Sequence, residues 1–252
     1  MEVILNLIIG VACGLLINYL ADVLPTQRKL GQPACTHCEK TYPLADYLMF
    51  RNCSGCGKPR SWRSFITPAA AALSAVALGM AESLKLGFWF SLLVLFFMGL
   101  VVIIDIEHRL ILHVVSLSGM AIGVLAGWNA HEWSLSGLGY TLLGGLIGFG
   151  VMLIFYLVGV QYARYRARKM GLKDVDEEAL GFGDVMLAGA LGLMLGWPRL
   201  ILGLVTGVLL AGVFSLILIL GLALARKLDL GNLYIPYGPF LILGAVLYIF
   251  FL

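Results

Sequence analysis

Eight long apolar runs, separated by polar segments, constrain this chain more than any other feature. The interior of a bilayer offers no water to backbone N–H and C=O groups, so a spanning segment must be a helix or part of a closed barrel. The runs are continuous and lack the alternation of a barrel strand, and 61% of the 252 residues are hydrophobic. The sequence therefore predicts an all-α membrane protein with about eight transmembrane helices.

The expected spans cover residues 2–24, 65–81, 86–104, 112–130, 137–160, 184–197, 199–225 and 234–252. The sixth falls short of the roughly 20 residues that cross a bilayer unless it takes in flanking residues. We expect the first to be a retained span. Glu2 stands where a signal peptide has its basic start, and no small-residue cleavage site follows.

Basic residues fall in alternate loops. All but Lys85 and Arg199 of the 17 Lys and Arg side chains follow the first, third, fifth or seventh span. Cytoplasmic loops carry such an excess. We therefore expect these loops in the cytoplasm and both termini outside, in a multi-pass protein of the bacterial inner membrane. The loops that follow the first, third and fifth spans cover residues 25–64, 105–111 and 161–183.

Two Cys-x-x-Cys pairs lie in the 25–64 loop. Cys35 and Cys38 form the first pair and, after fourteen residues, Cys53 and Cys56 form the second. Four thiolates in two such pairs suit a tetrahedral zinc ion, and the spacing is close to the usual four-cysteine zinc pattern. The sequence predicts a structural zinc site that shapes this cytoplasmic loop.

Two other interpretations of the cysteines stay open. They could form disulfides or redox-active pairs, although stable disulfides are rare in the reducing cytoplasm. His37, inside the first pair, could compete as a ligand, although a solvated loop histidine is the simpler interpretation.

Two aspartates lie at matching ends of their spans. Asp105 follows the apolar run of the third span, and Asp184 begins the sixth, which puts both carboxyl groups at the same depth on the cytoplasmic side. Paired carboxyl groups that share one proton are the catalytic equipment of an aspartic protease. Gly181 and Gly183 would let a substrate backbone approach closely. The alternative is that Asp184 caps its helix and that Asp105 is an interfacial charge.

Other polar residues near these spans are weaker candidates. Asn18 and Asp22, one helical turn apart, would line a polar pocket for a leader peptide or cofactor, or else be interfacial polarity. Glu107 and His108 are expected in the 105–111 loop, either orienting substrate or simply solvated.

Several segments together resemble one known family, the type IV prepilin peptidases, which are GxGD membrane aspartic peptidases. The second catalytic motif of that family resembles GFGDVMLAGALGLMLGW with Asp184, and the first resembles DIEHRLI with Asp105. IPYGPFLILGA at 235–245, the cysteine box, the SWR that follows it and GLLIN near the N-terminus fit the same family.

The resemblance implies cleavage of the basic leader of prepilins or pseudopilins, the subunits of type IV pili and type II secretion systems, at the cytoplasmic face. In many members it also implies methylation of the new N-terminus from S-adenosylmethionine. We expect residues 1–64 to hold the first transmembrane helix and the cytoplasmic zinc-binding region, as a possible methyltransferase part, and residues 65–252 to form the transmembrane aspartic peptidase core. Glu177 and Glu178 would attract the basic leader or be solvated.

Three features depart from the family pattern. Leu112 and His113 stand where many members have proline and aspartate, and Met186 stands where many have lysine. The region between the two cysteine pairs is also unusual. The first two departures bear on substrate preference and pH profile, and the third bears on methylation.

Two alternative functions are weighed against the peptidase. One is a GxGD intramembrane protease with other substrates. The other is a non-enzymatic transporter or assembly scaffold, whose charges should lie near the membrane midplane on broken helices. Both aspartates lie at the membrane margin, which favours the enzyme. Besides its substrate, the expected partner is membrane lipid, and no nucleic acid is expected.

Overall fold

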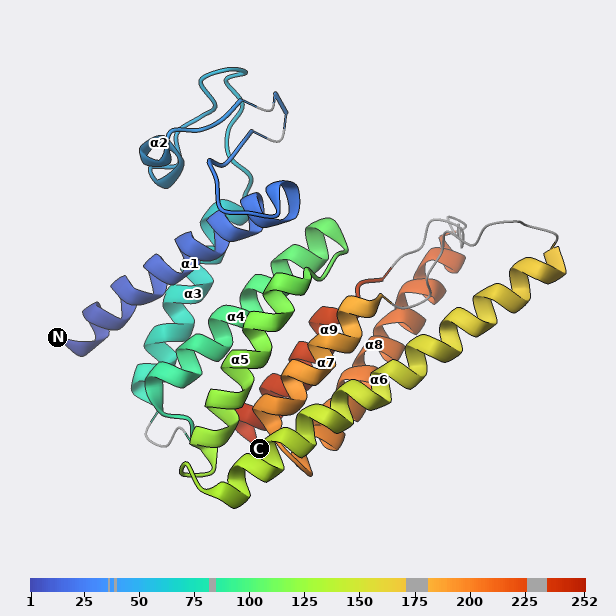
Figure 1. Cartoon of the computed structure of the whole chain (residues 1–252). Coiled ribbons are helices and arrows are strands. Elements are labelled where there is room, and N and C mark those ends of the chain that lie inside the picture. Colours follow the sequence, from blue (N-terminus) through green and yellow to red (C-terminus); the bar gives the residue numbers. More distant parts are fainter. Residues whose placement is uncertain (36, 39, 82–84, 171–180, 226–234) are drawn as a thin grey trace. The chain divides into compact units, whose positions relative to one another are not determined.

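The computed structural model describes the whole chain except residues 36, 39, 82–84, 171–180 and 226–234 (Figure 1). The described residues form helices and loops, with one isolated β-bridge between Ala34 and Thr41. Within these residues, six helices are long and apolar enough to cross a membrane, and two further apolar helical segments are shorter. The predicted all-α membrane class is confirmed, and the count of eight spans stays a prediction.

The chain divides into two compact units, Met1–Ile104 and Asp105–Leu252. The boundary falls inside α4 (Gly87–His108), just before Asp105. The functional division expected after residue 64 is a separate matter and stays a prediction.

The first unit is built on α1 (Glu2–Gln27) and α3 (Arg63–Met80), which pack side by side. Gly10 and Gly14 make this possible. A Cβ atom on Gly10 would come within 2.5 Å of the Ala72 Cα atom, and Gly14 lies directly against Pro68. Small residues let apolar helices approach closely where no hydrophobic effect drives them together. The loop between α1 and α3 carries a one-turn helix, α2 (Leu44–Leu48).

The second unit holds the remaining helices. They are α5 (His113–Ala130), α6 (Leu135–Met170), α7 (Phe182–Leu195), α8 (Arg199–Leu224) and α9 (Gly238–Val246), which continues into the π-helix η1 (Leu247–Phe251). Helix α7 packs against both α5 and α6, and α8 packs against α9 (Figure 1).

Helix α7 is short and is largely surrounded by protein. Every residue from Leu187 to Leu195 is buried. Glycines on its neighbours bring the backbones together, since a Cβ atom on Gly148 of α6 would lie 2.5 Å from the carbonyl oxygen of Ala188. Its 14 residues extend about 21 Å, less than the roughly 30 Å hydrocarbon layer. This accounts for the short sixth segment in the sequence.

The predicted starts of two loops are wrong, because the helices before them are longer than expected. Helix α4 continues to His108, so Asp105, Glu107 and His108 lie in its last turn and not in a loop. The turn comes at Arg109, whose backbone has a positive φ of 53°. Helix α6 also runs ten residues past the expected end of its apolar run, to Met170. The added residues are mostly good helix formers, and basic side chains near a helix C-terminus are favourable.

Candidate active site and cysteine cluster

Asp105 is buried near the end of α4, with 5% of its surface exposed. Its Oδ2 atom accepts a hydrogen bond from the backbone N–H of Gly238, at 3.1 Å. Gly238 is the first residue of α9 and is itself buried. The carboxyl group therefore meets the N-terminal end of a helix, where N–H groups and the helix dipole favour negative charge.

Asp184 is the third residue of α7, and its backbone N–H donates to the carbonyl of Gly181 at 3.0 Å. Its half-buried carboxyl group also interacts with the backbone of Gly181. The contact of the carboxyl group with the Gly181 backbone is half of a capping box, because the N-cap residue Gly181 has no side chain to complete it. Asp184 therefore does help to start its helix. The same carboxyl group also interacts electrostatically with Asp105. The structure thus brings together the two predicted catalytic aspartates, 79 positions apart in the sequence.

The two glycines of the GFGD turn have different surroundings. Among the described residues, a Cβ atom on Gly181 would meet the Asp184 Oδ2 atom at an ordinary 3.5 Å and the Gly183 backbone nitrogen at 3.9 Å, so a side chain would fit beside this carboxyl group. A Cβ atom on Gly183 would lie 2.7 Å from the Cβ atom of Ile111. Gly183 is therefore explained by packing, and the substrate-binding role of both glycines stays a prediction.

The other residues of interest around this site fall into two groups. Glu177 and Glu178 lie outside the described residues. His113 and Met186, both departures from the family pattern, contact each other, with His113 Nδ1 3.1 Å from Met186 Sδ. The two departures are therefore one local change, beside Asp184 in the sequence.

Gly238 was not among the predicted site residues. Its contact joins positions 133 residues apart, which no local pattern reveals. The available signal was a glycine followed by proline at the start of an apolar helix, since proline favours the first turn.

The four predicted cysteines form one cluster in the first unit. Their Sγ atoms all lie within 4.8 Å of one another. Cys35 and Cys56 are 3.7 Å apart, and Cys38 and Cys53 are 3.5 Å apart. A tetrahedral zinc site with 2.3 Å bonds has sulfur atoms about 3.8 Å apart. The cluster therefore fits a zinc ion without a large rearrangement.

The two Cys-x-x-Cys turns are built alike. The N–H of Cys35 donates to the carbonyl of Lys40, and that of Cys53 to the carbonyl of Lys58. In the second turn, hydrogen bonds from the backbone N–H groups of Cys56 and then Gly55 lower the pKa of the Cys53 thiol to about 6. A lowered pKa favours the thiolate, which is the form that binds metal.

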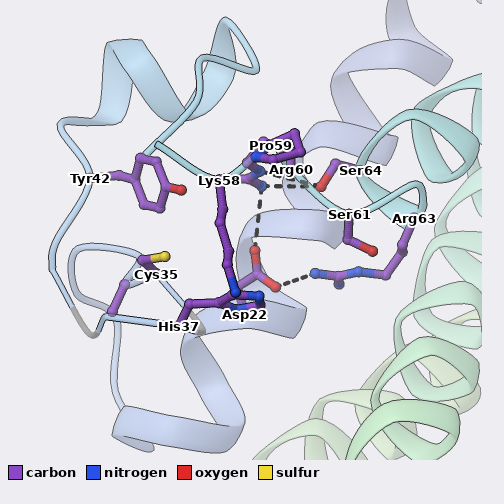
Figure 2. Close-up of a pocket in the computed structure, with 11 residues that line it drawn as sticks. Asp22, Cys35, His37, Tyr42, Lys58, Pro59, Arg60, Ser61, Arg63 and Ser64 are labelled. Atoms are coloured by element: carbon purple, nitrogen blue, oxygen red, sulfur yellow. Dashed lines mark hydrogen bonds and ion pairs between the residues drawn. The ribbon is translucent and has the colours of Figure 1, made fainter. Parts of the chain in front are cut away.

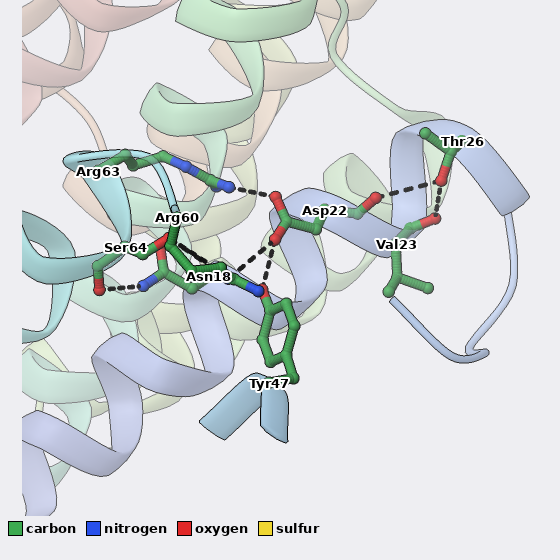
Figure 3. Close-up of polar contacts among 8 residues, drawn as sticks. All are labelled: Asn18, Asp22, Val23, Thr26, Tyr47, Arg60, Arg63 and Ser64. Atoms are coloured by element: carbon green, nitrogen blue, oxygen red, sulfur yellow. Dashed lines mark hydrogen bonds and ion pairs between the residues drawn. The ribbon is translucent and has the colours of Figure 1, made fainter. Parts of the chain in front are cut away.

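Asp22 connects this loop to the apolar helices (Figure 3). Its carboxylate binds Arg63 at the start of α3, lies 3.5 Å from Arg60 and accepts the hydroxyl hydrogen of Tyr47. One turn earlier, the buried Asn18 donates from Nδ2 to the Ser64 carbonyl at 2.9 Å. Asp22 therefore holds the loop against α1, and Asn18 joins α1 to the start of α3.

A cavity of about 280 Å³ lies between this network and the cysteine cluster (Figure 2). Asp22, Cys35 and His37 contribute to its wall. Lys58 and Arg60 also line it and give the wall an excess of cationic side chains among the described residues. Asp22 thus lines a polar pocket, but Asn18, which was expected to line it too, is not among its lining residues. A leader peptide or cofactor as its ligand stays a prediction.

The comparisons with known proteins agree with this geometry. The model of the type IV leader peptidase family matches residues 92–217, which is half of the chain and contains Asp105 and Asp184. Among similar proteins are three named prepilin leader peptidase/N-methyltransferase. That of Aeromonas hydrophila is 28% identical over 229 residues, which cover 87% of this chain and 71% of the relative.

Two other relatives are similar to the same extent. That of Aeromonas salmonicida (strain A449) is 28% identical over 83% of this chain and 66% of its own. That of Pectobacterium carotovorum subsp. carotovorum is 28% identical over 84% of this chain and 72% of the relative. No solved structure matches the chain. Because the family model covers half of the sequence and includes both aspartates, this chain belongs to the type IV leader peptidase family.

Proposed function

We propose that this protein is a prepilin leader peptidase that uses Asp105 and Asp184 as its catalytic pair. The family match and the names of the relatives support the peptidase activity. The observation that carries the choice of residues is the electrostatic interaction of the two carboxyl groups, at the end of α4 and the start of α7.

The proposed mechanism follows from two carboxyl groups that share one proton. The ionised group takes a proton from a water molecule, whose oxygen attacks the scissile carbonyl carbon. The protonated group donates to the carbonyl oxygen as the tetrahedral intermediate forms. When the C–N bond breaks, a proton passes to the leaving nitrogen and the pair returns to its shared state. The apparent pKa values of such a reaction belong to the pair and not to either residue.

The site is proposed to face the cytoplasm from the inner membrane. The distribution of basic loops supports this orientation. Single cysteine labels test it. Residues 60 and 168 should react only from the cytoplasmic side and residue 132 only from outside, and labelling of residue 168 from outside would contradict it.

The substrate is proposed to be a prepilin or pseudopilin with a basic leader. The names of the relatives support the prepilin. Glu177 and Glu178 lie two residues before the GFGD turn in sequence and would attract such a leader. Exposed pairs of this kind are each worth roughly 0–1 kcal/mol, so they would orient the leader and not by themselves fix its affinity.

Zinc is the proposed ligand of Cys35, Cys38, Cys53 and Cys56. The sulfur spacing supports it. Four protein ligands close a zinc site and leave no open coordination position. Its proposed role is therefore to hold the loop together.

Methylation of the new N-terminus is proposed because the relatives are named N-methyltransferase as well as peptidase. S-adenosylmethionine is the proposed methyl donor. The cavity beside the cysteines does not fit this cofactor well. Its volume of about 280 Å³ is at or below the roughly 300–1,000 Å³ of sites for larger ligands, and its cationic wall does not favour a sulfonium.

Purified full-length protein in lipid vesicles, mixed with a prepilin, tests the proposed function. Asp105→Asn and Asp184→Asn should each abolish leader cleavage, as measured by mass spectrometry, because asparagine keeps the shape but cannot exchange the proton. Asp46→Asn, an exposed loop change, is the matched control and should cleave normally. Turnover near that of the unchanged protein in either active-site variant would refute the catalytic pair. If the unchanged protein left prepilin intact but cleaved another membrane peptide, a GxGD protease with other substrates would be indicated.

A further inference from the structure

The contact between Gly238 and Asp105 is specific in its geometry. The Gly238 N–H lies 3.1 Å from Oδ2 of Asp105, and both residues are buried. The next residue, Pro239, has no N–H to offer. The N–H groups of Phe240 and Leu241 donate back to the carbonyl of Tyr237. The start of α9 thus directs the Gly238 amide to the Asp105 carboxyl group.

Glycine at this position is explained by space and not by backbone conformation. Gly238 is not among the glycines with positive φ, so its backbone would accept a side chain. A Cβ atom built there would lie 2.6 Å from Oδ2 and 3.3 Å from Cγ of Asp105. Real Cβ atoms do not approach other atoms so closely, so any side chain would displace the carboxyl group. Only glycine supplies the backbone N–H and also leaves room for the Asp105 carboxyl group that accepts from it.

We propose that Gly238 is a positioning residue for peptide cleavage, whose backbone N–H fixes Oδ2 of Asp105 and so presents Oδ1 to the shared proton and the attacking water. A hydrogen bond from a buried N–H also favours the ionised carboxylate. The inference rests on the proposed function, because it gives Asp105 a role in the reaction.

The first test compares Gly238→Ala with Gly212→Ala in vesicles. Gly212, on α8, has no described atom within 4 Å of where its Cβ would lie, so it receives the same chemical change without crowding. Gly238→Ala should lower kcat for leader cleavage by about 10- to 100-fold, because small misplacements of a catalytic group have effects of that size. KM should change little, and Gly212→Ala should behave like the unchanged protein.

A second measurement does not depend on turnover. Dicyclohexylcarbodiimide reacts with protonated carboxyl groups in apolar surroundings, and mass spectrometry can locate the adduct on Asp105. The added methyl group displaces the carboxyl group and so breaks its hydrogen bond with the N–H, which destabilises the carboxylate, and the pH midpoint of Asp105 modification should rise in Gly238→Ala. A purely structural role for Gly238 would lower the yield of folded protein and leave this midpoint in place.

Replacement of residue 238 by glycolic acid covers the case in which Gly238→Ala fails to fold. This ester removes the N–H and adds no side chain. The midpoint of Asp105 modification should again rise, with reduced kcat. An unchanged midpoint and kcat in the ester variant would overturn the proposal.

The outcomes separate this proposal from the proposed function. If Asp105→Asn abolishes cleavage but the ester variant matches the unchanged protein, the catalytic pair stands and the role of Gly238 falls. If Asp105→Asn cleaves normally, the proposed function falls, whatever the modification midpoint shows.

Discussion

Tyr47, on the one-turn helix α2 of the loop, donates its hydroxyl hydrogen to the carboxylate of Asp22, on the apolar helix α1. Burial and then the negative charge of Asp22 raise the pKa of Tyr47, so the phenol stays a donor at neutral pH. The Arg60 guanidinium also lies over the ring of Tyr47, with its Cζ atom 3.9 Å from the ring centroid. One carboxylate therefore holds a loop helix and two arginines at the end of a membrane span.

Asp22→Asn should loosen the 28–62 loop. Arg60 and Arg63 have side chains only 7% and 16% exposed, and removing the partner of a buried charge costs about 3 kcal/mol. Limited proteolysis should then cleave the loop roughly 100-fold faster, if cleavage follows the open population. Asp46→Asn is the matched control. The Asp46 pair with Arg51 is more exposed and should change cleavage by less than about fivefold. Equal effects of the two variants would contradict the proposed anchoring role of Asp22.

The cysteine cluster should contain one zinc ion per chain and should release it in acid. Protons compete with zinc for thiolates. The lowered pKa of Cys53, about 6, keeps its thiolate at neutral pH. Bound zinc favours the thiolate further, so zinc should be released only when the pH falls below the pKa of Cys53. A zinc-sensitive dye measures release as the pH falls. Purified protein that contains no bound zinc, and whose four thiols are all freely alkylated, would contradict the site.

Close packing of α6 against α7 predicts opposite behaviour for two nearby glycines of α6. Gly148→Ala should lower stability by about 1–3 kcal/mol, because its Cβ atom would press on the carbonyl oxygen of Ala188, 2.5 Å away. Gly150→Ala has open space and should be neutral or slightly stabilising. Thermal unfolding in detergent compares the two. A Gly148→Ala midpoint at or above that of Gly150→Ala would show that the helices are less closely packed.

The contact between His113 and Met186 predicts coupled substitutions. Many members of the family that this sequence resembles have aspartate and lysine at these two positions. The contact between His113 and Met186 places the two positions close enough for such side chains to pair. Met186→Lys alone should destabilise the protein or reduce turnover, and adding His113→Asp should recover part of the loss. The site is partly exposed, so the recovery should be about 0.5 kcal/mol. A double-mutant cycle on thermal stability and turnover measures it, and strictly additive effects would mean that the two residues act independently.

The apolar runs predicted the helices well, because burial in lipid leaves the backbone few alternatives. The cysteines could also be predicted, since a metal site with four close ligands has a characteristic spacing. The ends of α4 and α6 could not, because helix propensity and charge extended both helices beyond their apolar runs. The contacts of Gly238 with Asp105 and of Asp22 with Tyr47 join distant segments, and their partners are ordinary residues in sequence. Asp105 and Asp184 stood out because charged side chains are rare beside such spans and because both lie in segments that resemble the motifs of a known family.

The burial of α7 has a consequence for biosynthesis. A helix of 14 residues that contacts protein along most of its length has little lipid-facing surface of its own, and it is too short to cross the bilayer alone. It should therefore leave the translocation channel only together with α5 and α6, which are made before it and carry the glycines that receive it. Substitutions in those glycines would then act during synthesis, by leaving α7 and its aspartate outside the bilayer in a chain whose other helices have inserted.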